Sequence, residues 1–365
     1  MDTLLRSMSI LGLIASTQAF CLNSTDLEIK ELERRVSNLE HQKNANGVIN
    51  PSGRPQVRHG ADLCITGDLL IWQSHVNGLG YGVKSASSSN LSTSQTKEMH
   101  FNWDPGFRVG LGYNLPHDGW DLHAYYTNFY NKATGTTNSF NQSYLYPVAN
   151  DPYFYVYSNP SSIQGKWQLN LNMIDLEMGR EFFVSKWLIL RPFLGLRNAW
   201  IHQRFFSNTN HLYLSSNNNF YDYHFEAKSK YWGIGLRPGL DTQWGLGKGF
   251  SVYGNSAFSI LYGFFQMQQK QYNEAANLDY IEYMNNYHSM RIARAIAETE
   301  LGLRWETMFA KDQCHFSIQV AWENMIFFGQ NDFDRFVSSS QPGVYVANQG
   351  DLTIQGYSLG LRLDF

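Results

Sequence analysis

The chain has 365 residues, a formal net charge of −3, only 16% charged residues and as many as 15% aromatic residues. Soluble domains usually carry about 25% charged residues, so the composition excludes a coiled-coil rod, a disordered tail and a polyelectrolyte. Nucleic acid is excluded as a partner because the chain lacks the basic excess that such binding requires. No apolar stretch reaches the roughly 18 residues of a spanning helix, so a form that crosses a membrane has to be a β-barrel.

Residues 1–19 have the features of a signal peptide for export. Arg6 forms a short basic start, Met8 to Ala15 are mostly apolar, and Thr17 and Ala19 place small residues at the −3 and −1 positions of a cleavage site. We therefore predict cleavage after Ala19. An exported chain enters a compartment in which disulfides can form.

Residues 20–43 are predicted to form a short coiled-coil helix. The residues at the a and d positions of its 3.5-residue repeat are Leu22, Ile29, Leu32, Val36 and Leu39. An isolated helix of this length is marginal in water, so the stripe favours packing against copies of itself, and we expect a homo-oligomer, with a trimer as our choice. The alternative is a single amphipathic helix that lies against its own chain or the cell-wall layer. Residues 44–60, rich in Asn, Gly, Pro and Ser, are expected to be a linker.

From residue 61 onward the apolar period changes to 2, which is the period of β-strands. The clearest case is the stretch 294–306, where five charged side chains share one face and Ala, Leu and Trp share the other. A face with five charges must meet water, because burying charges without partners is costly, and the opposite face then meets lipid. We therefore predict an all-β fold in which residues 61–365 form a transmembrane antiparallel up-and-down β-barrel.

Counting from the C-terminus gives ten strands, and the segment Gly78–Lys84 with the long loops offers a hairpin that would make twelve. The expected strands lie near 61–73, 101–115, 118–131, 165–182, 186–204, 228–246, 249–267, 290–309, 313–328 and 352–365. Short polar turns alternate with long polar stretches between them, as periplasmic turns and extracellular loops do in such barrels. The apolar parity changes between Leu171 and Ile174 and between Ile354 and Tyr357, where we expect β-bulges.

The last strand carries the pattern that barrel assembly needs. Its apolar side chains alternate with polar ones and end in an aromatic residue with the terminal carboxylate; they are Tyr357, Leu359, Leu361, Leu363 and Phe365. This resembles the signal by which bacterial outer-membrane barrels are recognised. We expect outer-membrane lipid and the outer-membrane assembly machinery as partners.

Several segments together resemble one family, the Legionella-type major outer membrane proteins, which also occur in chlamydia-like bacteria. The matching segments are Asp68–Trp72 followed by Gly78–Tyr81, Pro105–Tyr113, Gly119–Leu122, Asp175–Arg180, Arg191–Arg197 and Gly302–Trp305, together with the N-terminal heptad. The likeness covers nearly the whole mature chain. It implies a porin-like barrel in the outer membrane of a Gram-negative bacterium, cross-linked by disulfides, and it supplies no catalytic residue.

By strand parity, a set of charged side chains points into the barrel and is predicted to line a pore. The set comprises Arg108, Arg191, Arg197, Arg237, Asp241, Arg294, Glu298, Glu300, Arg304, Glu306 and Glu323. Mixed rings of this kind set charge selectivity and conductance. We predict passive diffusion of small hydrophilic solutes, without catalysis, cofactor or metal. In the alternative, the ions pair across the lumen and stabilise a plugged barrel.

Two other functions stay open: a structural or adhesive barrel whose loops contact host surfaces or neighbouring envelope proteins, and an outer-membrane enzyme. An enzyme would need an Asp, His or Ser constellation at the outer rim, where His202, His211, His224 and His288 fall near loops beside Asp222 and Ser289. Their spacing singles out no base and partner.

The cysteines and one loop complete the candidates. The three cysteines of the mature chain are an odd number, so at least one thiol is free or intermolecular; Cys21 and Cys64 are the disulfide candidates. The loop Asn273–Asn286 carries apolar residues at helical spacing and is either an inward constriction helix or a surface cap.

Overall fold

The computed structural model describes residue 34 and residues 50–58, 60–86, 93–116, 118–139, 143–148, 160–214, 219–275, 278–336, 345–347 and 350–365. The predicted signal peptide, Cys21 and the heptad residues of the coiled coil lie outside the described residues. Among the described residues, no helix is long and apolar enough to cross a membrane.

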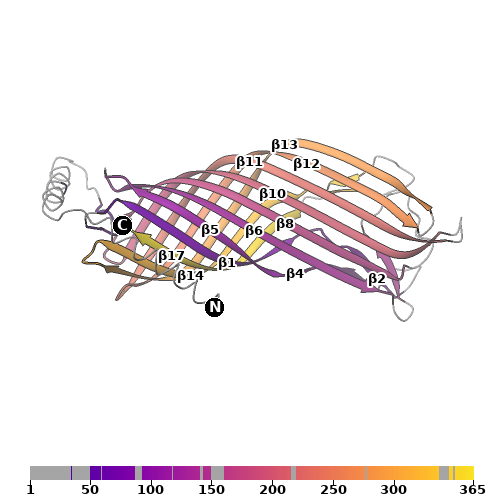
Figure 1. Ribbon diagram of the computed structural model, residues 1–365, viewed down its shortest axis with the longest axis horizontal. Helices are drawn as coiled ribbons and strands as arrows, with labels where there is room; N and C mark the ends of the chain where they lie inside the picture. The colour runs from indigo at the N-terminus through magenta and orange to yellow at the C-terminus, as the bar shows by residue number, and fades with distance from the viewer. Residues whose placement is uncertain are drawn as a thin grey trace, which may run out of the picture.

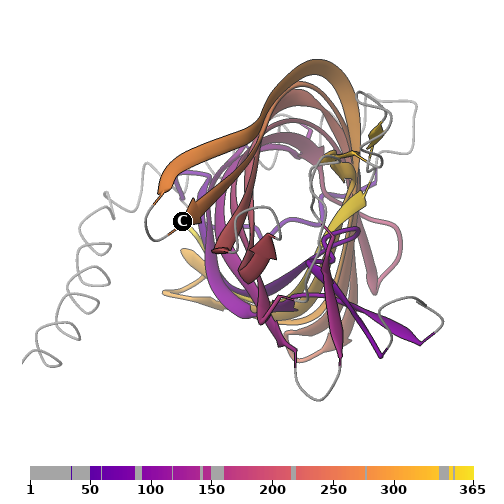
Figure 2. The ribbon, with the colours of Figure 1, turned by 90° about the vertical axis from the view of Figure 1, so that its right-hand side faces the viewer.

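The described chain forms a closed antiparallel barrel of ten long strands (Figure 1). They are β1 (Leu63–Val76), β5 (Trp103–Asn114), β6 (Trp120–Asn138), β8 (Ser162–Arg180), β10 (Leu188–Leu214), β11 (Asn219–Gly247), β12 (Phe250–Ala275), β13 (Leu278–Phe309), β14 (Cys314–Asn331) and β17 (Gly350–Asp364). Each pairs with its neighbour along the chain, and pairing of β17 with β1 closes the circle. Viewed along its length, the wall encloses an interior (Figure 2). The predicted ten-stranded barrel is confirmed.

The alternative of twelve strands is wrong. The segment expected to add a hairpin forms β2 (Gly82–Ser85), which pairs with β3 (Ser94–Lys97) and β7 (Tyr144–Pro147) in a separate sheet. The remaining short elements are β4 (His100–Phe101) on β6, β9 (Phe182–Phe183) on β10, and the pair β15 (Asp334–Phe336) and β16 (Tyr345–Ala347).

Short turns join the long strands at one end of the barrel, and this end is the periplasmic one in barrels of this kind. Outside the barrel, near this end, the alternation exposes the apolar side chains. On β17, for example, Tyr357, Leu359 and Leu361 point outward with 57%, 44% and 48% of their surface exposed, followed by Leu363 and Phe365, which are half-buried. The wall therefore carries the apolar band that a bilayer requires.

The two predicted bulges are absent from the pairing. Along β8, Leu171 and Met173 are buried inside the barrel while Ile174 and Leu176 point outward, and β8 pairs with β6 and β10 without a register shift. Along β8 the apolar residues therefore move from the outer face of the wall to its inner face. The reason is that the strand continues beyond the membrane, where its outer face meets water and its inner face packs against a core. The same change occurs on β17, with Ile354 inside and Tyr357 outside.

The extracellular part of the barrel has a hydrophobic core on its inner side. Its buried members include Leu70, Trp72, Phe129, Ile163, Trp167, Leu169, Leu171, Ile201, Phe205, Leu261, Phe265, Phe327 and Leu352. The β2–β3–β7 sheet docks on this core through Tyr81, which lies against Gly135 and Gly165 on the inner faces of β6 and β8. Since a spanning strand needs about 9–11 residues, most of β13 with its 32 residues extends beyond the membrane.

Candidate functional site

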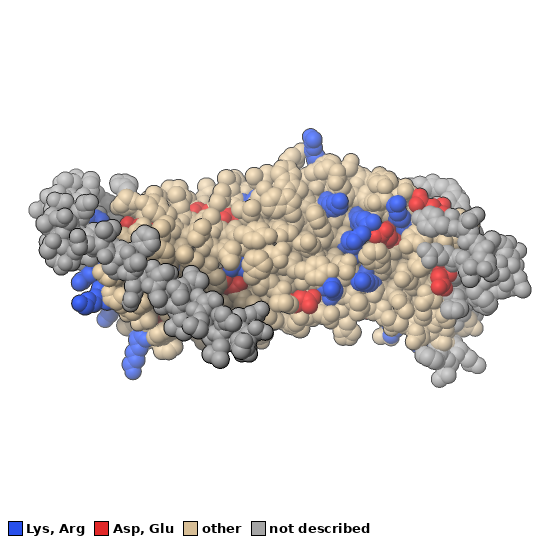
Figure 3. All heavy atoms as spheres, in the orientation of Figure 1, with Lys and Arg blue, Asp and Glu red and all other residues tan. Residues whose placement is uncertain are grey.

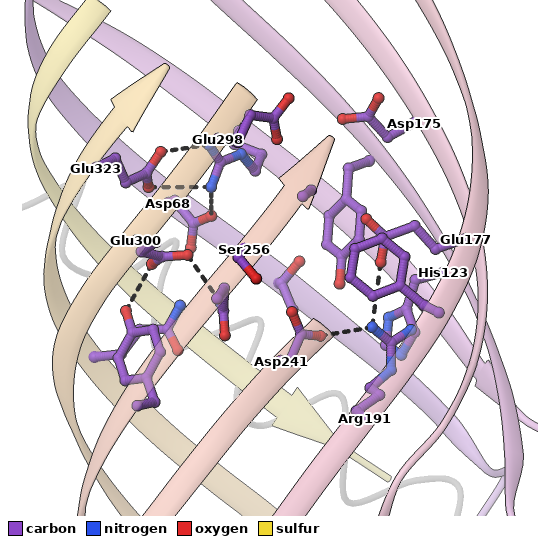
Figure 4. A pocket seen from close by; sticks show the side chains of 18 of the residues that line it. Asp68, His123, Asp175, Glu177, Arg191, Asp241, Ser256, Glu298, Glu300 and Glu323 are labelled. Atoms are coloured by element: carbon purple, nitrogen blue, oxygen red, sulfur yellow. Dashed lines mark hydrogen bonds and ion pairs between the residues drawn. The ribbon is translucent and has the colours of Figure 1, made fainter. Parts of the chain in front are cut away.

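A charged chamber lies inside the barrel, on the periplasmic side of the hydrophobic core. It has a volume of about 190 Å³ and is lined by eight carboxylates and six guanidinium groups. Figure 4 shows part of this lining. The carboxylates belong to Asp68, Asp175, Glu177, Glu181, Asp241, Glu298, Glu300 and Glu323, and the guanidinium groups to Arg108, Arg191, Arg197, Arg237, Arg304 and Arg362. Strand alternation places most of them there, because they take the inward positions of their strands between outward and mainly apolar neighbours.

Arg191 on β10 joins four strands on one side of the chamber. Its guanidinium lies 2.6 Å from Asp121 on β6, 3.2 Å from Glu177 on β8 and 2.8 Å from Asp241 on β11. Glu177 also bonds Arg237, whose Nη2 donates to Glu298 at 2.7 Å. Carboxylates thus bridge the arginines.

Arg197 lies deeper in the same wall, and its side chain is 2% exposed. It donates two hydrogen bonds of 2.6 Å to Asp175 on β8 and also contacts Glu298 on β13. A bidentate pair of this geometry fixes both side chains in place.

The opposite wall is more acidic. Arg108 on β5 donates to both carboxylate oxygens of Glu323 on β14, at 3.2 and 2.8 Å, and to Asp68 on β1 at 3.3 Å. Glu300 is the direct register partner of Glu323 and accepts hydrogen bonds from Tyr253 and Asn255 at 2.7 and 2.9 Å. The carboxylates of Asp68, Glu300 and Glu323 therefore gather on this side of the chamber (Figure 4).

Of the eleven residues that the sequence predicts to line the lumen, nine line this chamber. Arg294 lies elsewhere and pairs with Asp332 at 3.0 Å. Glu306 is outside the lining as well and accepts a hydrogen bond from Gln243 at 3.2 Å. Both residues belong to β13, which is longer than the chamber. Arg294 lies on the extracellular side of the chamber and Glu306 on its periplasmic side.

Sequence reasoning missed several acids of the networks, among them Asp68, Asp121, Asp175 and Glu177. Their signal was present: Asp175 and Glu177 alternate with Ile174, Leu176 and Met178. Strand parity would have placed them inside had it been applied to every strand.

The last residues of β14 and the link to β15 fold into the extracellular part of the barrel, where the pairing of β14 with β17 shifts register between Phe327 and Asn331. We call residues Gly329–Asp334 the infolded segment. Gln330 and Asn331 are each 1% exposed and Asp332 and Phe333 each 5% exposed. The main-chain carbonyl of Gln330 accepts a hydrogen bond of 3.0 Å from Gln203 on β10, which is four strands away around the wall.

Further contacts hold the infolded segment from three other strands. Gln269 on β12 donates to the carbonyl of Asp334 at 2.9 Å, Arg294 on β13 pairs with Asp332, and Asp351 on β17 accepts a bond of 2.8 Å from the amide of Gly329. Burial raises the pKa of Asp332 and of Asp334 above the usual carboxyl range.

Of the two alternatives for Asn273–Asn286, the inward constriction helix is wrong. Residues up to Ala275 extend β12 and residues from Leu278 extend β13, so this loop prolongs the wall. The chain enters the lumen instead at the infolded segment, whose buried amides and carbonyls find partners on the inner faces of the strands.

Part of the predicted linker runs across the periplasmic end of the barrel. The carbonyl of Pro51 accepts a bond from Phe183 at 3.0 Å, Arg54 donates to the carbonyl of Leu115 at 3.0 Å, and Arg58 donates from its amide to Asp312 at 2.8 Å. Three different short turns are thus joined by residues 51–58. Burial lowers the pKa of the Arg54 guanidinium.

Cys64 lies at the periplasmic start of β1 and points inward. Its thiol is buried 3.8 Å from Nδ1 of His123 and forms no disulfide among the described residues. The disulfide expected for Cys21 and Cys64 stays a prediction.

The rim residues considered for catalysis do not converge. His202 and Ser289 lie on outward, exposed positions of β10 and β13, and His224 bonds Asn208 at 2.9 Å on the outer side. His288 faces inward, 3.9 Å from Asp334. The side chain of His211 is not among those that the structure describes. The described members of the set lie on different sides of the wall.

Comparison with curated protein sequences finds no match. Among solved structures, the outer membrane protease OmpT from Escherichia coli is similar with a TM-score of 0.40 and 9% identity, covering 84% of this chain and 97% of that one. The toluene transporter TbuX from Ralstonia pickettii is similar with a TM-score of 0.32 and 8% identity, covering 84% of this chain and 90% of that one. The translocator domain of the autotransporter NalP from Neisseria meningitidis is similar with a TM-score of 0.27 and 10% identity, covering 93% of this chain and 97% of that one. Similarities at this level carry no argument about activity.

One family model matches most of the chain. It is described as the Legionella pneumophila major outer membrane protein precursor and matches residues 54–365, which include the whole barrel and the residues that cross its periplasmic end. The ten-stranded barrel, its apolar outer band and this match agree, and the chain therefore belongs to the Legionella major outer membrane protein family.

Proposed function

We propose that this outer-membrane β-barrel protein is a pore through which small hydrophilic solutes diffuse passively. The supporting observation is the charged chamber. Replacing buried ion pairs by well-packed apolar side chains is often neutral or stabilising, so a barrel that serves only as an anchor has no need for eight carboxylates and six guanidinium groups inside. Charges in such number favour a water-filled passage, since water reduces the cost of keeping them ionised.

The passage proposed here continues outward along one side of the interior. Buried but uncharged polar side chains follow the inner faces of β10, β11 and β12, including Gln203, Ser207, Ser229, Gln269 and Gln271. They alternate there with apolar core residues such as Phe205 and Phe265, whereas the inner faces of β1, β6 and β8 are mainly apolar, with Ser74 and Asn131 as buried polar residues. The infolded segment lies against the polar side through Gln203 and Gln269 and narrows the route. Solutes that pass must therefore be small.

The charge balance of the chamber favours cations weakly. The lining has two more carboxylates than guanidinium groups, and the excess lies on the wall of Asp68, Glu300 and Glu323. Because both signs are present and paired, strong ion selectivity is not expected. The proposed transport involves no catalytic step and no cofactor.

Single-channel recording in planar bilayers tests the proposal. The wild type should conduct with a small preference for potassium over chloride. Arg304→Glu removes one positive charge from the lining and adds one negative charge, so it should increase this preference, measured as a shift of the reversal potential in a salt gradient. Lys132→Glu is the matched control, because it makes the same charge change at an exposed, outward position of β6.

The possible results separate the candidate functions. An unchanged reversal potential for Arg304→Glu, with normal conductance, would remove the chamber from the conduction path. No conductance from folded wild-type protein would contradict the pore and favour a structural or adhesive barrel.

A further inference from the structure

The outer wall carries a row of basic side chains beyond the apolar band. They are outward-facing residues of β6, β8, β10, β11 and β13, namely Lys132, Lys166, Arg204, Lys228, Lys230 and Arg291, and we call them the basic belt. All are exposed except Lys228, which is half-buried. In the space-filling view, Lys and Arg gather toward the extracellular end over these strands, with a few Asp and Glu among them, and another group of Lys and Arg lies at the opposite end (Figure 3).

The height of the basic belt is defined by neighbouring indoles. Trp200 on β10 and Trp232 on β11 are register partners, and both point outward. Indole side chains prefer the headgroup level of a membrane. The next two outward pairs toward the extracellular end are His202 with Lys230 and Arg204 with Lys228. At about 3.3 Å per residue, the first of these pairs lies roughly 7 Å further along the strands than the indoles. The belt thus begins where lipid headgroups lie.

The charges of the basic belt are largely uncompensated by protein. Within the described part of the chain, no carboxylate lies at ion-pair distance from Lys166, Lys230 or Arg291. Glu226 is the acid that approaches the belt, at 3.4 Å from Arg204 and 2.8 Å from Lys228. A net positive surface therefore faces outward at this level.

The belt follows the wall from β6 to β13 and does not continue onto β1 and β17. At the corresponding extracellular ends of β1 and β17, the outward residues are Gln73 and His75, and Asp351, Thr353 and Gln355. Neither strand places a Lys or Arg there. Basic residues placed for solubility alone would be distributed around the whole wall, so their restriction to neighbouring strands indicates a binding surface.

We propose that the basic belt binds the phosphate-bearing headgroups of anionic lipids in the outer leaflet of the membrane. Lysine and arginine pair with phosphate through charge-assisted hydrogen bonds, and a basic residue near an anionic lipid surface strengthens binding. The chain belongs to an outer-membrane family, and the belt lies beside the indoles, so a lipid headgroup reaches it without leaving the bilayer. The inference does not depend on whether the lumen conducts.

Tryptophan fluorescence provides the test, because Trp200 and Trp232 lie next to the belt. The protein is reconstituted in phosphatidylcholine vesicles that contain a minor fraction of phosphatidylglycerol, and bromine atoms on the acyl chains of one lipid or the other quench nearby indoles. At equal mole fraction, brominated phosphatidylglycerol should quench the wild type more strongly, corresponding to an enrichment of roughly twofold or more around the belt. Salt at about 0.5 M should remove most of the excess, since it screens charges at headgroup distances.

The variant Lys166→Gln/Lys230→Gln should lose most of the enrichment. Lys84→Gln/Lys97→Gln is the matched control: it removes the same charge from the β2–β3 sheet and should retain the enrichment. Adding inorganic phosphate at millimolar concentration should leave the enrichment in place, which distinguishes a lipid site from a site for free phosphate.

Two results would overturn the proposal. One is equal quenching of the wild type by the two brominated lipids. The other is an enrichment that persists in Lys166→Gln/Lys230→Gln while the barrel stays folded, as judged by circular dichroism.

Discussion

Arg108 on β5 and Glu323 on β14 are joined by two hydrogen bonds of 3.2 and 2.8 Å, although β17 and β1 lie between their strands in the sheet. The residues are 215 positions apart in the sequence. The pair therefore spans part of the lumen and links the first and last thirds of the chain.

Arg108→Met should destabilise the barrel, because it leaves Glu323 and Asp68 without their shared cation. The chamber is neither a dry core nor an open surface, so we expect the free energy of unfolding to fall by about 1–3 kcal/mol. Urea unfolding in detergent micelles, followed by tryptophan fluorescence, measures this change. The double variant Arg108→Met/Glu323→Gln should recover part of the loss. Glu226→Gln, which removes a partner of exposed Arg204, is the control and should change stability by less than about 1 kcal/mol.

Release of the infolded segment should increase conductance. Gln203→Ala/Gln269→Ala removes two hydrogen bonds to the segment's carbonyls, and each such bond contributes about 0.5–1.5 kcal/mol. We expect a larger mean single-channel conductance and more frequent transitions between levels. Gln266→Ala/Gln268→Ala is the control, because these neighbouring residues of β12 point outward. The same conductance in both double variants would argue against a role of the segment in conduction.

Docking of the infolded segment should depend on pH through Asp332 and Asp334. Burial raises both pKa values, against the opposing effects of Arg294 and His288, so the docked segment holds protons more tightly than a released one. By linkage, docking is strongest below the raised pKa values and weakens as pH rises through them. Conductance should therefore increase between about pH 4, near the ordinary carboxyl range, and pH 7.

Recording the wild type over this pH range measures the dependence, and Asp332→Asn/Asp334→Asn should flatten it. His288→Gln should keep it, since the two carboxyls remain. A conductance that falls as pH rises would contradict the sign derived from burial.

Close contact with Tyr81 makes Gly165 sensitive to substitution. A Cβ atom at Gly165 would lie 2.7 Å from Cβ and 2.8 Å from Cγ of Tyr81, so Gly165→Val should displace the tyrosine and the β2 strand that follows it. We expect a loss of about 1–3 kcal/mol in the free energy of unfolding, as for other overpacked sites. At Gly67, on the outer face of β1, a Cβ atom would have no neighbour within 4 Å. Gly67→Val should therefore leave thermal unfolding nearly unchanged; equal losses for the two variants would exclude packing against Tyr81 as the cause.

Much of the barrel was predictable because lipid outside and water inside impose opposite demands on alternate residues. The stretch 294–306 shows this most clearly: its charged residues point inward and Leu301 and Leu303 point to the lipid side. Where a strand passes from lipid into water, the same rule of alternation gave a wrong prediction. At Leu171 and Ile174 a straight strand leaves the membrane, and the change of apolar side looked like a bulge.

The charged chamber was predictable in its members but not in its pairing. Parity places Arg191 inside, yet its partners Asp121, Glu177 and Asp241 come from three other strands. The lateral offset between paired strands determines which of these side chains meet, and no local pattern encodes that offset. The infolded segment is a further example, because Gln203 and Gln330 are separated by 127 positions.

The amino-acid sequence by itself determined the β-barrel class, the face that most residues of the spanning strands take and the location of the short turns, because these follow from a two-residue period and local turn chemistry. Tertiary structure alone decided how far β10–β13 extend beyond the membrane, which acids pair with which arginines, and which segment enters the lumen. These features depend on contacts between residues far apart in the chain, and such contacts exist only once the sheet has closed and set the register of all its strands.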